Sequence, residues 1–543
     1  MEGLRELLGK NKRAAVGFCI FWILMAGYLL WRMFYIAPWY DETVTYREFI
    51  HRGTWYSMTH WPLPTNHVFY CVLSSILDIF GNPYLTLRGV SYAAALVNLI
   101  LLFGCLCRKT KPEPALAGCM IYSGFWLVMD QSVQGRGYTL SNVFVLTCIL
   151  CVHQIFHDRR EGLTVKKRFF AGYAISMFLA LYTVPTNFYW IFALCAAIFV
   201  LCCLEKEWKL LWRFVRYGIG SALMTVCMYS FIWISTGLRQ LGTSDITFVS
   251  FLKKFPQIVL TGIEDMLSNE IIQPVGRKAA ISGMGEWLRE LAEQILGTGS
   301  MISAAAAVVV GCLMLISFAG FVKTLTGRSE FCRSEKRRGI DFFLLFSWIS
   351  IWAVPILLVL QGTLPFYRCF LWICIPLIII LADAADRIRF CARSKWESNC
   401  GKRQKGKWES RWQGAWKKYG WPLVCLCLGI YAYGKQSFED NKNENEIQEI
   451  LDHTEGEMEK VIWGDARTEA YVYFVYGTDF EEDPYEPDHI IVKKAALDPE
   501  YQGYWDDYYT YGDLPWEYIN SQMRVYYETE EYIGFCAKDS LDK

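Results

Sequence analysis

Two adjacent carboxylates have the clearest capacity for chemistry in this sequence. Asp41 and Glu42 come soon after the first long hydrophobic run, at about residues 14–36. A charged pair that close to a membrane boundary either faces water or serves a function. An accessible carboxylate is ionised at neutral pH and can accept a proton from an attacking hydroxyl or amine, which typically accelerates a reaction by about 10²–10⁴-fold. Asp41, with Glu42 beside it, is therefore our candidate catalytic base.

Two arginines could supply the positive charge that such a reaction needs. Arg136 in residues 134–138 and Arg368 in residues 365–368 each lie at the mouth of a later hydrophobic run. The guanidinium group is planar and permanently charged, and it binds phosphate through two parallel hydrogen bonds. A phosphate-linked sugar leaves as a stabilised anion, so one base suffices, whereas hydrolysis of an ordinary glycoside usually takes two carboxylates. We expect both arginines to bind the leaving phosphate, although either could only anchor its helix.

Four further residues are candidate substrate contacts, namely Asn66, His67, Asp130 and Tyr138. Asn66 and His67 could form hydrogen bonds in the site or cap the helix that follows them. Asp130 could steer the acceptor or be an ordinary solvated charge. His67 could also bind a divalent metal together with His60 or the Asp-Glu pair, but no HExxH-type spacing supports this. We therefore expect no metal and no other cofactor.

The elements that position these residues are membrane helices. The chain has 543 residues, of which 53% are hydrophobic, and its mean hydropathy is +0.19. That composition is too apolar for a soluble protein. Runs long enough to cross about 30 Å of hydrocarbon number about eleven, at 14–36, 88–107, 114–131, 137–156, 169–185, 187–204, 214–236, 300–322, 341–360, 369–385 and 419–434. The first lacks a small-residue cleavage site, so we expect an anchor that is retained.

The charge pattern predicts the orientation. The N-terminal tail and alternate loops hold 33 of the 54 basic residues, and such loops prefer the cytoplasm. Residues 436–543 contain 28 acidic and 8 basic residues, a net charge of −20, and would lie outside. We expect a multi-pass plasma-membrane protein with a cytoplasmic N-terminus. Its basic loops would contact anionic lipid headgroups, and no nucleic-acid partner is expected.

Two domains are expected. Residues 1–436 would form the transmembrane catalytic domain, with outer loops at 37–87 and 237–299. The first loop holds an apolar helical run at 64–80 that we place along the membrane surface, and the second holds helical patterns at 248–260 and 285–296. Residues 437–543 would form a small, acidic, aromatic-rich α/β domain outside the cell, with predicted strands at 461–463, 470–476 and 490–492.

Two further features of composition concern ligands of the outer domain and disulfides. Within Trp505–Asp513, aromatic residues alternate with carboxylates, which fits either a glycan-binding surface or an ordinary packed surface, and calcium binding stays open. Of the 20 cysteines, 15 fall within the predicted spans, where a free thiol behaves as a small hydrophobe. We therefore expect no disulfide framework.

At these motifs the sequence resembles the GT-C glycosyltransferases, specifically the family 39-like branch similar to protein O-mannosyltransferases and aminoarabinose transferases. The motifs that carry the resemblance are Asp41-Glu42, Thr65-Asn66-His67-Val68-Phe69 followed by Gly81-Asn82-Pro83 and Leu87-Arg88, Gly135-Arg136-Gly137-Tyr138, and Pro365-Phe366-Tyr367-Arg368 with Pro376. Thr65 and Gly135 depart from the usual Asn and Ala. The resemblance implies an α-helical polytopic membrane fold, Asp41 as catalytic base, a polyprenyl-phosphate-linked monosaccharide as donor, and inverting transfer on the outer face of the membrane.

Other functions remain open at this point. The acceptor could be a glycan, a lipid or a protein. A lipid-glycan ligase or oligosaccharyltransferase of the same superfamily is the nearest competing enzyme. A non-catalytic lipid-linked glycan transporter or envelope assembly protein is the alternative from a different class. Transporters tend to place ionisable residues at mid-membrane, whereas here the notable charges cluster at the outer ends of spans.

Overall fold

The computed structural model describes residues 12–61, 66–241, 248–268, 275–297, 301–326, 340–399, 442–454, 456 and 458–538. The predicted span at 419–434 and Thr65 lie outside these residues. The chain divides into two compact units. Unit 1 comprises residues 1–29, 61–70 and 91–436, and unit 2 comprises residues 30–60, 71–90 and 437–543.

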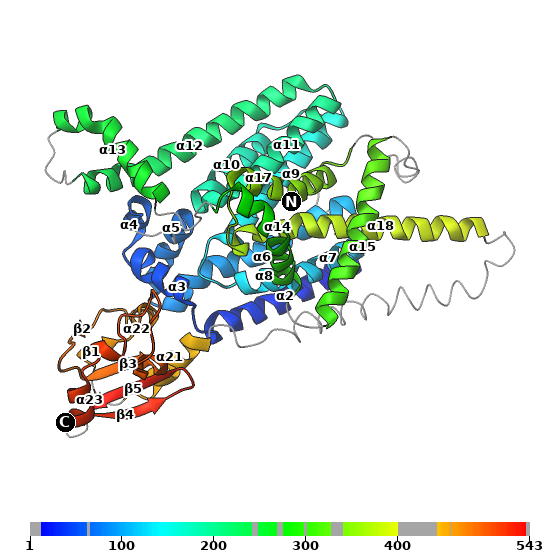
Figure 1. Cartoon of the computed structure of the whole chain (residues 1–543). Helices are drawn as coiled ribbons and strands as arrows, with labels where there is room; N and C mark the ends of the chain where they lie inside the picture. The colour runs from blue at the N-terminus through cyan, green and yellow to red at the C-terminus, as the bar shows by residue number, and fades with distance from the viewer. Residues whose placement is uncertain are drawn as a thin grey trace. The chain divides into compact units, whose positions relative to one another are not determined.

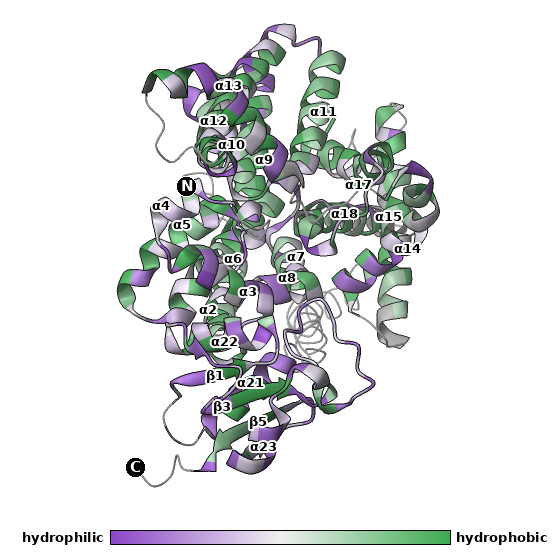
Figure 2. Cartoon of the chain, turned by 60° about the vertical axis from the view of Figure 1, so that its left-hand side comes forward, coloured by the Kyte–Doolittle hydropathy of each residue, from purple (hydrophilic) through white to green (hydrophobic). Residues whose placement is uncertain are grey.

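Eight helices within the described residues are long and apolar enough to cross a membrane, so the chain is an integral membrane protein. Figure 1 labels them, and Figure 2 colours α11 and α12 mostly in hydrophobic green. They are α2 (Lys12–Tyr35), α6 (Pro83–Lys109), α9 (Tyr138–Arg160), α11 (Phe188–Leu204), α12 (Trp208–Gln240), α15 (Met301–Leu325), α17 (Phe342–Gln361) and α18 (Cys374–Asn399), the last preceded by the 3₁₀ helix η4 (Tyr367–Ile373).

Two of the predicted spans are shorter than these. The prediction of one continuous span at 114–131 is wrong, because Phe125 is extended (φ −63°, ψ 129°) and separates α7 (Pro112–Gly124) from α8 (Trp126–Gln131). Gly124 is a poor helix former, which favours a break there. The other is α10 (Lys167–Thr183), with 17 residues.

The helical patterns predicted in the segments 37–87 and 237–299 are confirmed. They correspond to α5 (Val68–Leu77), which continues as the 3₁₀ helix η2 (Asp78–Phe80), and to α13 (Phe248–Ser268) and α14 (Arg277–Leu296). In unit 1, α9 packs on α10, α10 on α12, and α12 on α13, while α18 packs on α7, α15 and α17.

A buried ion network links α6, α17 and α18 within unit 1. Lys109 Nζ donates to Asp341 Oδ2 at 2.7 Å and to Asp383 Oδ1 at 3.1 Å. Arg387 Nε donates to Asp383 Oδ2 at 2.7 Å. Buried charges are tolerated when they are paired and hydrogen-bonded, so this network fits a structural role in holding the three helices together.

A mixed five-stranded sheet forms the core of unit 2. Its order is β2 (Glu481–Glu482), β1 (Lys460–Trp463), β3 (His489–Lys493), β5 (Tyr532–Ala537) and β4 (Met523–Glu528). β1 is parallel to β2 and β3, and β5 is antiparallel to β3 and β4. Val461 and Trp463 pack with α21 (Lys442–Asp452), whereas Ile462 packs with α23 (Trp516–Gln522) on the other face, as the period of two in a strand requires.

One strand prediction in this unit is wrong. The segment 470–476 lies in α22 (Ala466–Tyr476), although its Tyr and Val residues favour strands. The helix begins where the Asp465 side chain accepts the Thr468 N–H at 2.6 Å, and it ends at Gly477 in the left-handed conformation (φ 73°). These two caps satisfy the helix ends and outweigh the local β preference.

Candidate functional site

The Asp-Glu pair lies in the first turn of α3 (Tyr40–Thr45), which continues into the π-helical turn η1 (Tyr46–Ile50) in unit 2. Glu42 Oε2 accepts the backbone N–H of Trp39 at 2.9 Å, so the third helical residue reaches back to the start of the helix. Thr45 Oγ1 donates to the carbonyl of Asp41 at 2.6 Å. These contacts fix the backbone of the segment that carries both carboxylates.

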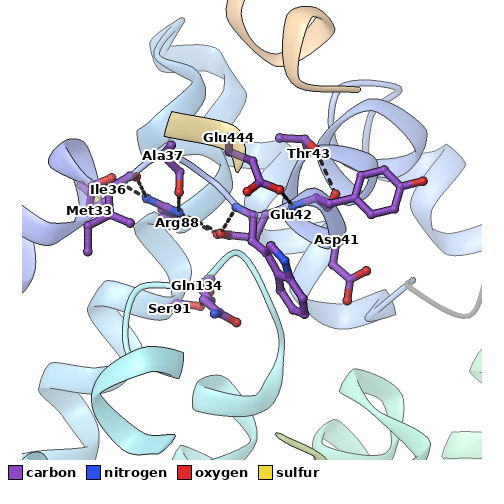
Figure 3. A network of polar contacts seen from close by, with 12 residues as sticks. Met33, Ile36, Ala37, Asp41, Glu42, Thr43, Arg88, Ser91, Gln134 and Glu444 are labelled. Carbon is purple, nitrogen blue, oxygen red and sulfur yellow. Dashed lines mark hydrogen bonds and ion pairs between the residues drawn. The ribbon is translucent and has the colours of Figure 1, made fainter. Parts of the chain in front are cut away.

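Glu42 is fully buried and forms a two-bond ion pair with Arg88. Arg88 Nε donates to Oε1 at 2.9 Å and Nη2 donates to Oε2 at 2.8 Å. The guanidinium also donates to the carbonyls of Met33, Ile36 and Ala37. The pair therefore ties the end of α2 to α3 (Figure 3). Both Glu42 oxygens accept hydrogen bonds within the fold, so the side chain is suited to positioning its neighbours.

Asp41 differs from its neighbour. Its side chain is only partly buried, and Figure 3 shows it directed away from the Glu42–Arg88 pair. The adjacent backbone is held from the C-terminal part of the chain, because Tyr40 N–H donates to Glu444 Oε1 at 3.0 Å. Arg467 Nη1 donates to the same oxygen at 2.6 Å. Burial raises the pKa of the Glu444 carboxyl, and Arg467 opposes that shift.

The remaining predicted site residues lie in unit 1, where His67 is central. Its ring is buried, and its Nδ1 accepts the backbone N–H of Gly137 at 2.6 Å. This bond assigns the proton of the neutral imidazole to Nε2. Burial, together with the charges of Arg136 and Arg368, holds the pKa of His67 well below its usual value. His67 is therefore neutral at physiological pH and lies within the field of both arginines.

Gly137 is required by this close approach. A Cβ atom at that position would lie 2.6 Å from Thr183 Cγ2 and 3.0 Å from His67 Nδ1. The carbonyls of Gln134 and Arg136 accept the Ser91 hydroxyl at 2.5 and 3.1 Å. The Gly-Arg-Gly loop is thus fixed on both sides before it enters α9.

Tyr138 and Arg368 complete the unit 1 group. The Tyr138 ring contacts His67 edge to face, with centroids 4.7 Å apart, and its hydroxyl lies 3.8 Å from Cys369 Sγ in η4. Arg368 precedes that cysteine, and its guanidinium carbon lies 4.8 Å from the centre of the Phe366 ring. The structure therefore brings the His67, Arg136, Tyr138 and Arg368 motifs together, although they are distant in sequence.

Asp130 and Asn66 have different surroundings. The carboxylate of Asp130 accepts the side-chain amides of Gln131 at 2.8 Å and Gln134 at 2.9 Å, so it braces the loop that leads to Arg136. Asn66 is fully buried directly before His67.

Two supporting residues were assigned no role from the sequence. One is Arg88, which the sequence offered only as part of the Leu87-Arg88 motif. The other is Trp287 of α14, whose indole N–H donates to the carbonyl of Pro365 at 2.9 Å, and whose ring contacts Phe370. Trp287 thereby supports the loop that carries Arg368, and only the fold reveals that contact.

The alternative of a divalent metal gains no support from the described part of the chain. Among residues 12–538, apart from the gaps given above, no three His, Cys, Asp or Glu side chains are grouped as a metal site would need.

Comparison with solved structures finds a similarity that covers nearly the whole chain. No protein-family model matches the chain, and no curated protein matches it in sequence. The crystal structure of ArnT from Cupriavidus metallidurans, bound to undecaprenyl phosphate, superposes with a TM-score of 0.53. The match covers 97% of this chain and 99% of that chain at 10% sequence identity. The chain therefore has the fold of that protein, a polytopic helical membrane fold with a small C-terminal α/β sheet, as predicted.

Proposed function

We propose that this protein transfers a monosaccharide from a polyprenyl-phosphate carrier to an acceptor on the outer face of the membrane. The observation that carries the proposal is the grouping of Arg136 and Arg368 around a neutral His67. Two guanidinium groups and an uncharged imidazole form a setting that attracts a phosphate. The ArnT fold supports the same ligand class, because the ArnT crystal structure contains undecaprenyl phosphate.

The proposed reaction is a single displacement. Asp41 accepts the proton of the acceptor hydroxyl or amine, whose lone pair attacks the anomeric carbon of the sugar. The bond between that carbon and the phosphate oxygen breaks, and the polyprenyl phosphate leaves with the electron pair. Arg136 and Arg368 neutralise the charge that develops on the leaving phosphate, and fixed charges do so without reorganising. One displacement inverts the configuration at the anomeric carbon.

The other predicted residues receive supporting roles in this proposal. Glu42 is assigned to position the Asp41 segment and not to exchange protons, because Arg88 and Trp39 occupy its oxygens. His67 donates from Nε2 to the substrate, while Tyr138 orients its ring. Asn66 is assigned to substrate binding.

Asp130 positions the Arg136 loop through Gln131 and Gln134. The acceptor class, whether glycan, lipid or protein, is left to experiment.

The test is a membrane assay with radiolabelled polyprenyl-phosphate sugars that follows the label from carrier to acceptor. Asp41→Asn should lower the transfer rate by at least about 100-fold while undecaprenyl phosphate still binds, because the amide keeps the shape of the carboxylate. Arg136→Ala should weaken carrier binding, and Arg136→Lys should restore it only in part, because the two-bond fork is lost. Glu48→Gln is the matched control, since Glu48 is a partly exposed carboxylate that pairs with Arg52 and Arg47 and is assigned no role in transfer.

Two outcomes would contradict the proposal. If Asp41→Asn kept more than about one tenth of the parent rate, Asp41 would not be the base. Carrier binding without transfer of any sugar by the parent protein would favour the alternative, a non-catalytic lipid-linked glycan transporter or envelope assembly protein.

A further inference from the structure

A cavity of about 340 Å³ lies within unit 2, between η1, α22, the loop that precedes β2 and the segment that precedes α23. Its volume falls in the range of ~300–1,000 Å³ that is typical of small-ligand pockets. The wall combines aromatic rings with charged side chains. The aromatic residues are Trp463, Tyr473, Phe480 and Tyr508.

The charged groups of this pocket are largely carboxylates. Arg47 Nη2 donates to Glu469 Oε1 and to Asp479 Oδ1, each at 2.8 Å. Glu482 is a third acid in the wall. One guanidinium and three carboxylates give a net negative pocket, and the positive charge is already shared by two acids. Phosphates and uronic acids are therefore disfavoured, while hydroxyl groups find several acceptor oxygens.

The aromatic groups are held in place by the same acids and by one another. The hydroxyl of Tyr508 donates to Glu469 Oε2 at 2.9 Å, and burial raises the pKa of Tyr508, so this hydroxyl keeps its proton. The rings of Trp463 and Phe480 meet edge to face at 5.9 Å. Tyr508 remains about half exposed. The electron-rich face of such a ring suits the weakly positive C–H groups of a sugar ring.

The neighbouring acids of the Trp505–Asp513 segment are already used within the fold. Lys493 Nζ lies 2.5 Å from Asp507 Oδ1 and 3.8 Å from Asp506 Oδ2. Tyr501 also donates to Asp507 at 2.7 Å. The Lys493 ammonium group therefore already neutralises Asp506 and Asp507, the acids at which a metal cation could bind. Tyr508 of the same segment lines the cavity.

We propose that this pocket binds a neutral, hydroxyl-rich carbohydrate. Carboxylates would accept the sugar hydroxyls, and Tyr508 and Tyr473 would contact the ring faces. The site is separate from the transfer reaction proposed above and does not depend on it. Its ligand class nevertheless fits an enzyme that handles glycans. The pocket residue Arg47 and the proposed base Asp41 lie on one short helical segment, α3 and η1.

The proposal is tested by equilibrium binding to the full chain. No polyprenyl-phosphate sugar is added, so turnover cannot contribute, and the protein is held in lipid nanodiscs, since detergents with sugar headgroups would compete. The probes are an array of neutral oligosaccharides built from hexoses and N-acetylhexosamines, with oligogalacturonate as the anionic probe. We expect at least one neutral probe to bind and oligogalacturonate not to bind.

Variants then locate the binding. Tyr508→Ala and Glu469→Gln should each weaken binding at least tenfold, while Tyr508→Phe, which keeps the ring, should lose less. Tyr485→Ala is the matched control, because Tyr485 is an exposed aromatic residue of the same unit outside the cavity. Thermal unfolding of each variant confirms that it is folded.

Failure to bind any neutral probe would overturn the proposal, and so would stronger binding of oligogalacturonate. Equal binding by the folded Tyr508→Ala and Glu469→Gln proteins would place the ligand elsewhere and overturn it too. None of these results bears on sugar transfer by the parent protein, which is measured separately.

Discussion

Glu42 offers the sharpest prediction, because replacing it separates a positioning role from a catalytic one. Glu42 and Arg88 are 0% and 1% exposed, and two hydrogen bonds of 2.8 and 2.9 Å join them. Removing one partner of a buried ion pair typically costs about 3–5 kcal/mol. Glu42→Gln should therefore lower the free energy of unfolding by about that amount. Asp41→Asn, at a partly buried residue outside this ion pair, should change it less, by about 1 kcal/mol or below.

A double-mutant cycle tests whether the pair itself is responsible. Arg88→Met leaves the Glu42 carboxylate unpaired, and Glu42→Gln leaves the guanidinium unpaired, but the double variant buries neither charge alone. The double variant should therefore lose less stability than the sum of the single variants, with a coupling of about 2 kcal/mol. The free energies come from denaturant titrations followed by tryptophan fluorescence.

Transfer activity decides between the two roles. If Glu42 only positions the segment, the Glu42→Gln protein should lose activity in proportion to its loss of folded protein. Its activity should then recover in part at low temperature. A Glu42→Gln protein as stable as the parent but inactive would refute this reasoning and return Glu42 to a catalytic role.

Two further predictions concern the unit 1 group. Since His67 has a pKa well below its value in the unfolded chain, unfolding takes up a proton below about pH 6.5, and stability falls as the pH falls. Between pH 7.5 and 5.5 the free energy of unfolding of the parent should fall by about 1.4 kcal/mol through this proton uptake. His67→Gln should lack that part of the fall. Equal pH dependence in denaturant titrations of both proteins would contradict the prediction. Gly137→Ala should displace His67 and reduce carrier binding at least tenfold, while the added change Thr183→Ser, which removes the methyl group 2.6 Å from the new Cβ, should restore binding in part. Unchanged carrier binding by Gly137→Ala would show that the close packing is not required.

Much of the membrane region could be predicted from the sequence, because a span is a local property of about 20 consecutive residues. The helices α9, α11 and α17 lie where the hydrophobic runs indicated. The break at Phe125 was not predicted, because it depends on a single residue in an apolar run. The segment 470–476 was misassigned for a related reason, since its caps at Asp465 and Gly477 matter more than the preferences of the residues between them.

The candidate site was only partly predictable. Asp41, Arg136 and Arg368 were chosen from residue type and position at the ends of spans, and their proposed roles remain predictions. The pairing of Glu42 with Arg88 joins residues that are 46 positions apart, and no local pattern encodes it. The bond between Gly137 N–H and His67 spans 70 positions. Such contacts arise from packing, so only the folded chain reveals them.

Unit 2 is built from three separate segments of the chain, and this has a consequence for its folding during synthesis. Its sheet is made entirely from residues after 459, whereas α3 is made near the start. Tyr40 meets Glu444 across 404 positions. At about 5–20 residues per second, roughly 20–80 s pass on the ribosome between the two. The α3 turn is therefore synthesised long before Glu444, the residue that accepts the Tyr40 N–H. A nascent chain that stalls before Glu444 would leave the Asp41 segment without that hydrogen bond.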